Sequence, residues 1–290
     1  MSVFVNQNTQ VLIQGITGTQ ASFHGKRSLD YGTKVVGGVT PGKGGTEHLG
    51  LPVFNTVKEA VAATKANASV MFVPARQVVS AVREGAEAEL ELMVCIADNV
   101  PIKDMLEVKA ILKGTKTKLI GPNTPGIITP GEARLGIFPE NIHKQGRVGI
   151  VSRSSTLTYE AVIETNRAGL GQSTVIGLGD DMIIGMDFVD AIQAFNEDDA
   201  TDVIVMIGQM GGLFEEDAAA YYRKLKQKKK IIGFVAGNTI PVGHHMGYVG
   251  EVMANGNISV QDKISAMRDA GIIVVDNIND IHKELAKVIS

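Results

Sequence analysis

In the middle of the sequence, a short apolar run leads into a polar turn whose residue types could bind a ligand. Residues 148–152 read as a strand, and Ser154, Ser155 and Thr156 follow where a helix should begin. The free N–H groups and the positive dipole end of a helix favour an anion at that position, and Arg153 adds a positive charge. Serine and threonine are also common caps. The segment therefore predicts either a phosphate or carboxylate site or an ordinary capped helix.

A second arrangement of strand, glycine turn and helix lies near the N-terminus. Residues 9–14 read as a strand, Gly15-Ile-Thr-Gly-Thr-Gln20 forms the turn, and a helical run follows over residues 21–31. The spacing G-x-x-G does not meet the dinucleotide fingerprint G-x-G-x-x-G, so the turn alone identifies no ligand. The next strand, over residues 34–39, ends in a glycine-rich loop with Lys43. A lysine in such a loop can either meet a phosphate as a point charge or stand in solvent.

Strands and helices alternate through the rest of the first half. We predict helices over residues 57–64, 78–88 and 104–112, and strands over residues 68–73, 92–96 and 118–120. Such alternation indicates a parallel sheet, whose strands end at one edge in the turns that bind ligands. The polar and glycine-rich turns at the strand ends favour a nucleotide-like ligand but do not identify it.

The second half shows the same alternation. Its predicted helices cover residues 187–195, 215–226 and 279–289, and its strands cover residues 203–207, 231–236 and 272–275. Glu215, Glu216 and Asp217 begin one helix, and because consecutive helix residues do not face one centre, we expect a solvated first turn and no metal site. The proline- and glycine-rich residues 121–131 are predicted to link two domains, residues 1–125 and 126–290.

Composition excludes several classes of protein. The 290 residues, 44% of them apolar and 20% charged, with 33 glycines, fit a two-domain α/β protein. A net charge of -3 gives no basic field for nucleic acid. Cys95, the single cysteine, lies in an apolar run and is expected to be a buried thiol. Neither a signal peptide nor a membrane-spanning segment is evident, so we expect a cytoplasmic protein without a membrane partner.

Five sequence blocks, in order, resemble one family: the α subunits of succinyl-CoA synthetase (succinate–CoA ligase) and their malate–CoA ligase relatives. The blocks are Gln14-Gly-Ile-Thr-Gly-Thr-Gln20, Gly37-Gly-Val-Thr-Pro-Gly-Lys-Gly-Gly45, Leu51-Pro-Val-Phe-Asn-Thr-Val57, Ile120-Gly-Pro-Asn-Thr-Pro-Gly-Ile-Ile-Thr-Pro-Gly131 and Val148-Gly-Ile-Val-Ser-Arg-Ser154. The resemblance implies a Rossmann-like domain that binds coenzyme A, followed by a flavodoxin-like, doubly wound domain. It also implies a ligase of the tricarboxylic acid cycle that joins a dicarboxylic acid to CoA. An ATP-grasp β subunit, in a heterodimer or heterotetramer, would bind ATP or GTP with Mg.

The resemblance also implies, by matching position, which residues would contact the ligands. The residues expected to hold the CoA phosphates follow the first two strands: Thr17, Gly18, Thr19, Gln20 and Lys43. The path of CoA would pass a later strand end, at Ile96, Ala97 and Asp98, where aspartate replaces the usual glutamate. Tyr159 would face the carboxylate substrate.

The second half departs from the family at the predicted phosphate site. The family's phosphohistidine segment reads Arg-Met-Gly-His-Ala-Gly-Ala, and Tyr248 stands here in place of the histidine, without a ring nitrogen to carry a phosphoryl group. Gln209 replaces the supporting glutamate and cannot stabilise an imidazolium by charge. Asp180 adds a negative charge at a predicted second phosphate-binding helix start, and Ser155 adds a side chain where the family has glycine.

These departures leave three interpretations open. The chain is the α subunit of an acid–CoA ligase with a lost or altered phosphohistidine relay, a non-catalytic or regulatory subunit that binds CoA, or the α subunit of a malate–CoA ligase. His244 or His245 could take over as phosphoacceptor, yet both match basic residues of the family, and proximity in sequence does not by itself orient a nucleophile.

Overall fold

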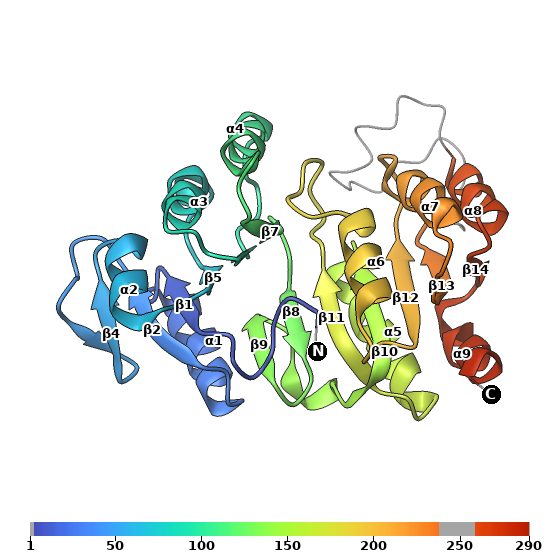
Figure 1. Ribbon diagram of the computed structural model, residues 1–290, viewed down its shortest axis with the longest axis horizontal. Coiled ribbons are helices and arrows are strands. Elements are labelled where there is room, and N and C mark those ends of the chain that lie inside the picture. Colours follow the sequence, from blue (N-terminus) through green and yellow to red (C-terminus); the bar gives the residue numbers. More distant parts are fainter. Residues whose placement is uncertain (1–2, 238–258, 290) are drawn as a thin grey trace. The chain divides into compact units, whose positions relative to one another are not determined.

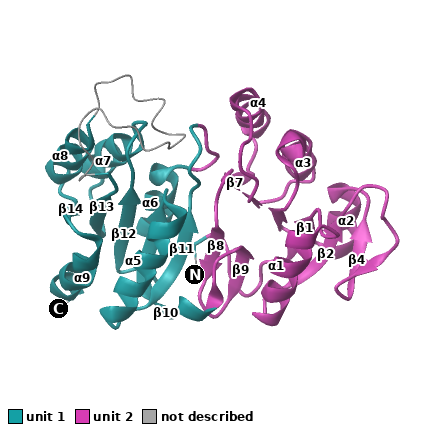
Figure 2. Ribbon diagram, turned by 180° about the vertical axis from the view of Figure 1, so that it is seen from behind, with its two compact units in different colours: residues 1–3, 141–182, 187–290 teal, residues 4–140, 183–186 magenta. Residues whose placement is uncertain are grey.

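The computed structural model describes residues 3–237 and 259–289, which form two compact units, each with a mainly parallel sheet (Figures 1 and 2). Unit 2 contains residues 4–140 and 183–186, and unit 1 contains residues 1–3, 141–182 and 187–290. The predicted domain boundary after residue 125 falls inside unit 2, and the point where one domain ends and the next begins stays a prediction.

The sheet of unit 2 has the strand order β3-β4-β2-β1-β5-β6-β7. Its strands are β1 (Val11–Gln14), β2 (Val35–Val39), β3 (Glu47–His48), β4 (Leu51–Phe54), β5 (Ala68–Met71), β6 (Leu92–Cys95) and β7 (Lys118–Ile120). Its helices are α1 (Thr19–Asp30), α2 (Val57–Thr64), the 3-10 helix η1 (Ala75–Gln77), α3 (Val78–Glu87) and α4 (Ile102–Leu112). β3 pairs antiparallel with β4, and the other neighbours pair in parallel. The predicted alternation in the first half is confirmed; β3 and β4 were not predicted.

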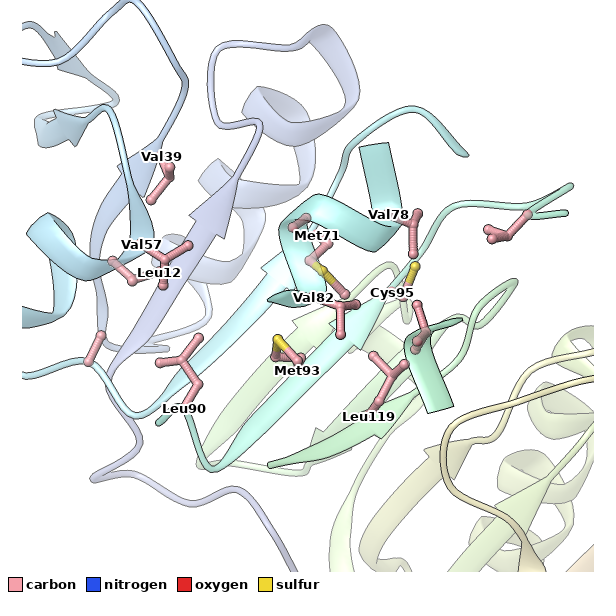
Figure 3. Packing of buried hydrophobic residues seen from close by; sticks show 14 of the residues in the cluster. Leu12, Val39, Val57, Met71, Val78, Val82, Leu90, Met93, Cys95 and Leu119 are labelled. Carbon is pink, nitrogen blue, oxygen red and sulfur yellow. The ribbon is translucent and has the colours of Figure 1, made fainter. Parts of the chain in front are cut away.

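Helices cover both faces of this sheet because neighbouring strand residues point in opposite directions. Leu12 belongs to the buried cluster that includes Val57 of α2 and Val82 of α3 (Figure 3). The next residue, Ile13, faces α1, where a Cβ on Gly25 would lie 2.8 Å from its side chain. Each fully buried aliphatic side chain of this kind contributes about 1.5–3 kcal/mol. The core therefore fixes the strand ends from which the turns leave.

The segment predicted to link two domains contains a strand. β8 (Gly126–Thr129) pairs antiparallel with β9 (Ala133–Gly136) in unit 2. The two backbones approach closely: a Cβ on Gly126 would lie 2.0 Å from the Leu135 carbonyl oxygen, and one on Gly136 would lie 2.3 Å from that of Pro125. The glycines therefore permit a close hairpin, and this part of the segment is not a free linker.

The parallel strands of unit 1 lie side by side in the order β14-β13-β12-β10-β11. The strands are β10 (Gln145–Ser152), β11 (Gln172–Gly177), β12 (Val203–Gly208), β13 (Lys230–Val235) and β14 (Ile273–Val274). The helices are α5 (Ser155–Arg167), α6 (Phe188–Glu197), α7 (Phe214–Lys224), α8 (Val260–Asp269) and α9 (Ile281–Ile289), with the 3-10 helices η2 (Glu140–Ile142) and η4 (Ile278–Asp280). α5 packs with α9, and α7 packs with both α6 and α8. α8 was not predicted.

Both units place their first parallel strand between two later ones. β1 lies between β2 and β5, and β10 lies between β11 and β12. Open α/β sheets bind ligands beyond the carboxyl ends of such strands, where the connections to the two neighbours diverge to opposite sides of the sheet. The turns after β1 and β10 are the two segments that the sequence singles out for anion binding.

Candidate functional site

The turn after β1 leaves the start of α1 accessible. Gly15 has φ 82°, and a Cβ there would lie 2.5 Å from the Phe72 carbonyl oxygen, so the position requires glycine. Gly18 is the N-cap of α1 and provides no side-chain cap. Thr19 and Gln20 are exposed in the first turn, where backbone N–H groups have no partner within the helix. This turn can therefore present N–H donors to an anion.

A folded loop brings Lys43 to the same turn. The N–H groups of Gly42 and Gly44 both donate to Oδ1 of Asn55, at 2.9 Å each. Lys43 Nζ lies 3.1 Å from Oγ1 of Thr17. The structure thus brings Lys43 together with the predicted phosphate turn, and a cation beside a helix N-terminus favours phosphate. The sequence did not predict the part played by Asn55.

Ile96, Ala97 and Asp98 lie at the same edge of the sheet but follow β6, which β5 separates from β1. Asp98 is exposed, and the other two residues are half-buried. The carbonyl of Ala97 accepts the N–H of Asn123 at 2.8 Å. Because parallel strands are spaced by about 4.8 Å, β6 lies about 10 Å from β1. A single ligand that contacts both segments must cross β5, and that contact stays a prediction.

His24, on α1, has surroundings that keep its ring neutral. The ring stacks on Phe72 with centroids 5.8 Å apart, and Nη2 of Arg134 lies 3.3 Å from Nδ1. Burial, and then the charges of Arg134 and Arg27, lower the pKa of His24 from 6.5 to about 4, although Glu140 acts in the raising direction. Arginine can only donate, so Nδ1 accepts and Nε2 carries the hydrogen. No sequence motif predicted this cluster.

The protein should lose stability as the pH falls from 6.5 to about 4. The pKa of His24 is lowered in the folded state, so the unfolded chain binds the proton first, and the contribution present above pH 6.5 is lost progressively. His24→Asn removes the titrating ring. Thermal unfolding of both proteins across this range should show a shallower decline for the variant, and equal declines would contradict the assignment.

The turn after β10 begins a capped helix. Ser154 is the N-cap of α5, and its Oγ accepts the N–H of Leu157 at 3.3 Å. Ser155 is half-buried and Thr156 is exposed in the first turn, and Tyr159 is half-buried one turn later. The capped-helix interpretation is confirmed, whereas binding of phosphate here and of a carboxylate at Tyr159 stay predictions.

The loops after β10, β11 and β12 meet through buried polar contacts. Arg153 donates from Nη2 to the carbonyl of Asp181 at 2.7 Å, and its guanidinium lies 4.1 Å from the centroid of the Phe214 ring. Gln209 donates from Nε2 to Oδ1 of Asp180. The structure thus brings together two of the substituted positions, Gln209 and Asp180, beside Arg153.

Asp180 does not stand at a helix start, contrary to the prediction. It lies in the loop after β11, and α6 begins at Phe188. Asp187 is the N-cap, and its Oδ1 accepts the N–H groups of Val189 at 2.8 Å and Asp190 at 3.1 Å. This capping box, followed by buried apolar residues, sets the start of the helix.

Glu215 is buried, so the prediction of a solvated first turn is wrong for this residue. Its Oε2 accepts from Nζ of Lys263 at 2.6 Å and its Oε1 accepts the N–H of Gln209 at 2.9 Å, and both charged side chains are 0% exposed. Lys263 Nζ also donates to the carbonyl of Gly212 at 2.7 Å and to Oε2 of Glu216 at 3.0 Å. The ion pair therefore connects the loop that carries Gln209 to α8.

Tyr248, His244 and His245 lie outside the described residues. Within residues 3–237 and 259–289, no group of three or more His, Cys, Asp or Glu side chains could hold a metal ion. A search of that same part of the chain finds no helix with the length and apolar character needed to cross a membrane.

The chain matches two protein families. Residues 6–99 match the CoA binding domain family, and residues 151–273 match the CoA-ligase family. The first range includes the turn after β1, Lys43 and residues 96–98. The second includes the turn after β10 and the loops that carry Asp180 and Gln209.

Curated relatives match over nearly the whole chain. The alpha subunit of ADP-forming succinate–CoA ligase from Staphylococcus epidermidis is 48% identical over 97% of this chain and 93% of the relative. The corresponding subunit from Staphylococcus aureus is 49% identical over 94% of this chain and 90% of the relative.

Solved structures share the fold at low identity. ATP citrate lyase from Methanothrix soehngenii, in complex with citrate and coenzyme A, gives a TM-score of 0.88 at 23% identity over 99% of this chain and 50% of that chain. Dinucleotide forming acetyl-coenzyme A synthetase 1 from Ca. Korarchaeum cryptofilum gives 0.75 at 21% identity over 95% of this chain and 60% of that chain. This chain spans only part of both. The predicted α/β class, Rossmann-like followed by flavodoxin-like, is confirmed.

Proposed function

The chain belongs to the family of succinate–CoA ligase alpha subunits, and we propose on that premise that unit 2 binds coenzyme A for an acid–CoA ligase reaction. One observation is the main support for this site: Nζ of Lys43 lies 3.1 Å from Oγ1 of Thr17. Both residues stand beside the start of α1, which has no side-chain cap. The phosphates of CoA are anions that a lysine and first-turn N–H groups stabilise together.

The reaction proposed is that of the family: a dicarboxylic acid, CoA and a nucleoside triphosphate give acyl-CoA, nucleoside diphosphate and phosphate. A β subunit of the ATP-grasp type would bind ATP or GTP with Mg, in a heterodimer or heterotetramer in the cytoplasm. The names of the relatives, which are alpha subunits, support a partner chain. We also propose, as an alternative, a malate-directed ligase, because Pro122-Asn-Thr-Pro125 and Ile96-Ala-Asp98 resemble that branch of the family somewhat more closely.

A second candidate function is a CoA-binding subunit that does not relay phosphate. The observation that favours it is the hydrogen bond from Gln209 to Asp180. A neutral amide supplies no charge to stabilise an imidazolium, and a carboxylate beside it disfavours a phosphoryl group. Tyr248, which the resemblance places at the phosphohistidine position, points to the same function.

Replacement of Lys43 by alanine should weaken CoA binding by about 1–2 kcal/mol, the scale of one charge-assisted hydrogen bond. Isothermal titration of the full chain with CoA measures this. Lys116→Ala is the matched control, since Lys116 is exposed and precedes β7, at the opposite edge of the sheet. If the folded wild-type chain gives no heat of binding, or the control weakens binding equally, the proposed site is wrong.

A further inference from the structure

The segment that carries Lys43 is mostly exposed and rich in glycine. It covers residues 40–55, hereafter the Lys43 segment, and its glycines Gly42, Gly45 and Gly50 have φ values of 80°, 83° and 73°. Glycine loses more conformational freedom on ordering than any other residue. Contacts with the rest of unit 2 must therefore hold the segment in place if Lys43 is to meet a phosphate at the turn after β1.

Hydrogen bonds of the backbone make the Lys43 segment one folded piece. The N–H of Gly45 donates to the carbonyl of Val53, and the N–H of Val53 donates to the carbonyl of Thr46, both at 3.0 Å. His48 lies on β3, which pairs antiparallel with β4 in the same segment. A contact that His48 makes with the rest of unit 2 therefore also bears on the position of Lys43.

His48 binds the Lys43 segment to α1 through the hydroxyl of Ser22. Its Nε2 lies 2.7 Å from Oγ of Ser22, and Oγ lies 2.8 Å from the carbonyl oxygen of Gly18 and 3.2 Å from that of Ile16. Carbonyl oxygens only accept, so the hydroxyl hydrogen is directed at them, and Oγ accepts from His48. His48 thus carries its hydrogen on Nε2, and the hydrogen bonds run from His48 through Ser22 to the backbone of the turn after β1.

The contact lies close to the start of α1. Because Oγ of Ser22 takes part in both hydrogen bonds, Nε2 of His48 lies no farther from the carbonyl oxygen of Gly18, the N-cap, than the sum of the two distances, about 5.5 Å. The next residue of the segment packs on the same face of α1: a Cβ on Gly25 would lie 3.2 Å from Cδ1 of Leu49. Two neighbouring side chains therefore hold the Lys43 segment against this helix.

We propose that His48 is a positioning residue of the CoA site: by donating to Ser22 it holds the Lys43 segment against α1, so that the ammonium group of Lys43 is in place for the phosphates. His48 itself does not need to touch the ligand. This role rests on the proposed function, since it concerns the same site, and it adds a residue to which the family resemblance gives no role. A cation that is in place before the ligand arrives spares the cost of ordering its segment on binding, which raises affinity.

A double-mutant cycle on the full chain tests this role, with CoA affinity measured by isothermal titration. His48→Phe keeps a ring but has no N–H to donate, and we expect it to weaken CoA binding by about tenfold, the scale of one hydrogen bond. In the Lys43→Ala background the same change should alter the affinity by less than about twofold, because His48 acts through Lys43. Equal losses in the two backgrounds would overturn the proposal, since His48 would then act independently of Lys43.

Two further variants separate positioning from a simple loss of stability. His48→Gln again offers a side-chain N–H and should recover most of the affinity that His48→Phe loses. Ser22→Ala removes the acceptor and should weaken CoA binding as much as His48→Phe does. If His48→Phe does not fold, Ser22→Ala takes its place in the cycle with Lys43→Ala, and the same two outcomes decide.

The matched control is His282→Phe, the same change at a half-buried histidine of unit 1 whose Nδ1 lies 2.6 Å from Oε2 of Glu164. It should leave CoA affinity unaltered, and an equal loss there would contradict the assignment. If the wild-type chain binds no CoA, the proposed function and this role are both wrong. If the wild-type chain binds CoA and Lys43→Ala weakens that binding whereas His48→Phe does not, only the role of His48 is wrong.

Discussion

Replacement of Lys263 by methionine should lower the free energy of unfolding by about 3–5 kcal/mol, because it leaves a buried carboxylate without its cation. Nζ of Lys263 lies 2.6 Å from Oε2 of Glu215, and both side chains are fully buried. Methionine nearly fills the lysine volume, so the loss comes from the unpaired charge of Glu215 rather than from a cavity. Domains are typically stable by only about 5–15 kcal/mol, and this loss is a large fraction of that.

Urea unfolding followed by far-UV circular dichroism measures the loss, since the sequence has no tryptophan for fluorescence. Lys283→Met is the control: its ion pair with Asp280 is 62% and 42% exposed, and its removal should change little. Combining Lys263→Met with Glu215→Gln should recover part of the stability, because a neutral amide oxygen can still accept the N–H of Gln209. If Lys263→Met costs no more than the control, the buried pair does not stabilise the fold.

Incubation of the chain with a cognate β subunit and radiolabelled ATP should leave no phosphohistidine at the family position. Tyr248 has no imidazole there, Gln209 has no charge to support one, and Asp180 brings a negative charge. Two unit charges about 4 Å apart interact by about 4 kcal/mol at an effective dielectric near 20. A repulsion of that size would empty a weak phosphate site.

Restoring phosphorylation should therefore need more than one substitution. We expect Tyr248→His alone to give little label, and its combination with Gln209→Glu and Asp180→Gly to give clearly more. Label that is stable to base and labile to acid identifies phosphohistidine. Stoichiometric labelling of the unaltered chain would refute the prediction, and a label on His244 or His245 would then identify the replacement nucleophile.

Elements that depend on local sequence could be predicted closely. The helix over residues 57–64 and the strand over residues 118–120 match α2 and β7, because apolar spacing and the Thr56 cap with Glu59 act within a few residues. The position of Thr17 and Lys43 at the carboxyl edge of the sheet could also be predicted, because parallel strands end at the same edge. The resemblance then supplied the ligand, which the spacing alone could not.

Contacts between distant residues could not be predicted in the same way. An acidic first turn suits the helix dipole whether it is solvated or buried, so only the arrival of Lys263 makes Glu215 a core residue. Asn55 accepts hydrogen bonds from the loop of Lys43, and Arg134 contacts His24. In both cases the partners are too far apart in the sequence for a local pattern to predict the contact. Asp180 was assigned to a helix start through the family resemblance, and because glycine and aspartate suit both loops and caps, the residue types did not correct that assignment.

Cys95 gives the protein a chemical reporter of its own. It is the single cysteine of the sequence, its side chain is 0% exposed, and it ends β6 directly before residues 96–98. A thiol reagent can reach it only when the end of β6 opens, so the rate of modification measures that local opening. A ligand that contacts residues 96–98, as predicted for CoA, would hold this strand end closed. Slower modification of the Cys95 thiol would then report that the ligand is bound, without an added label.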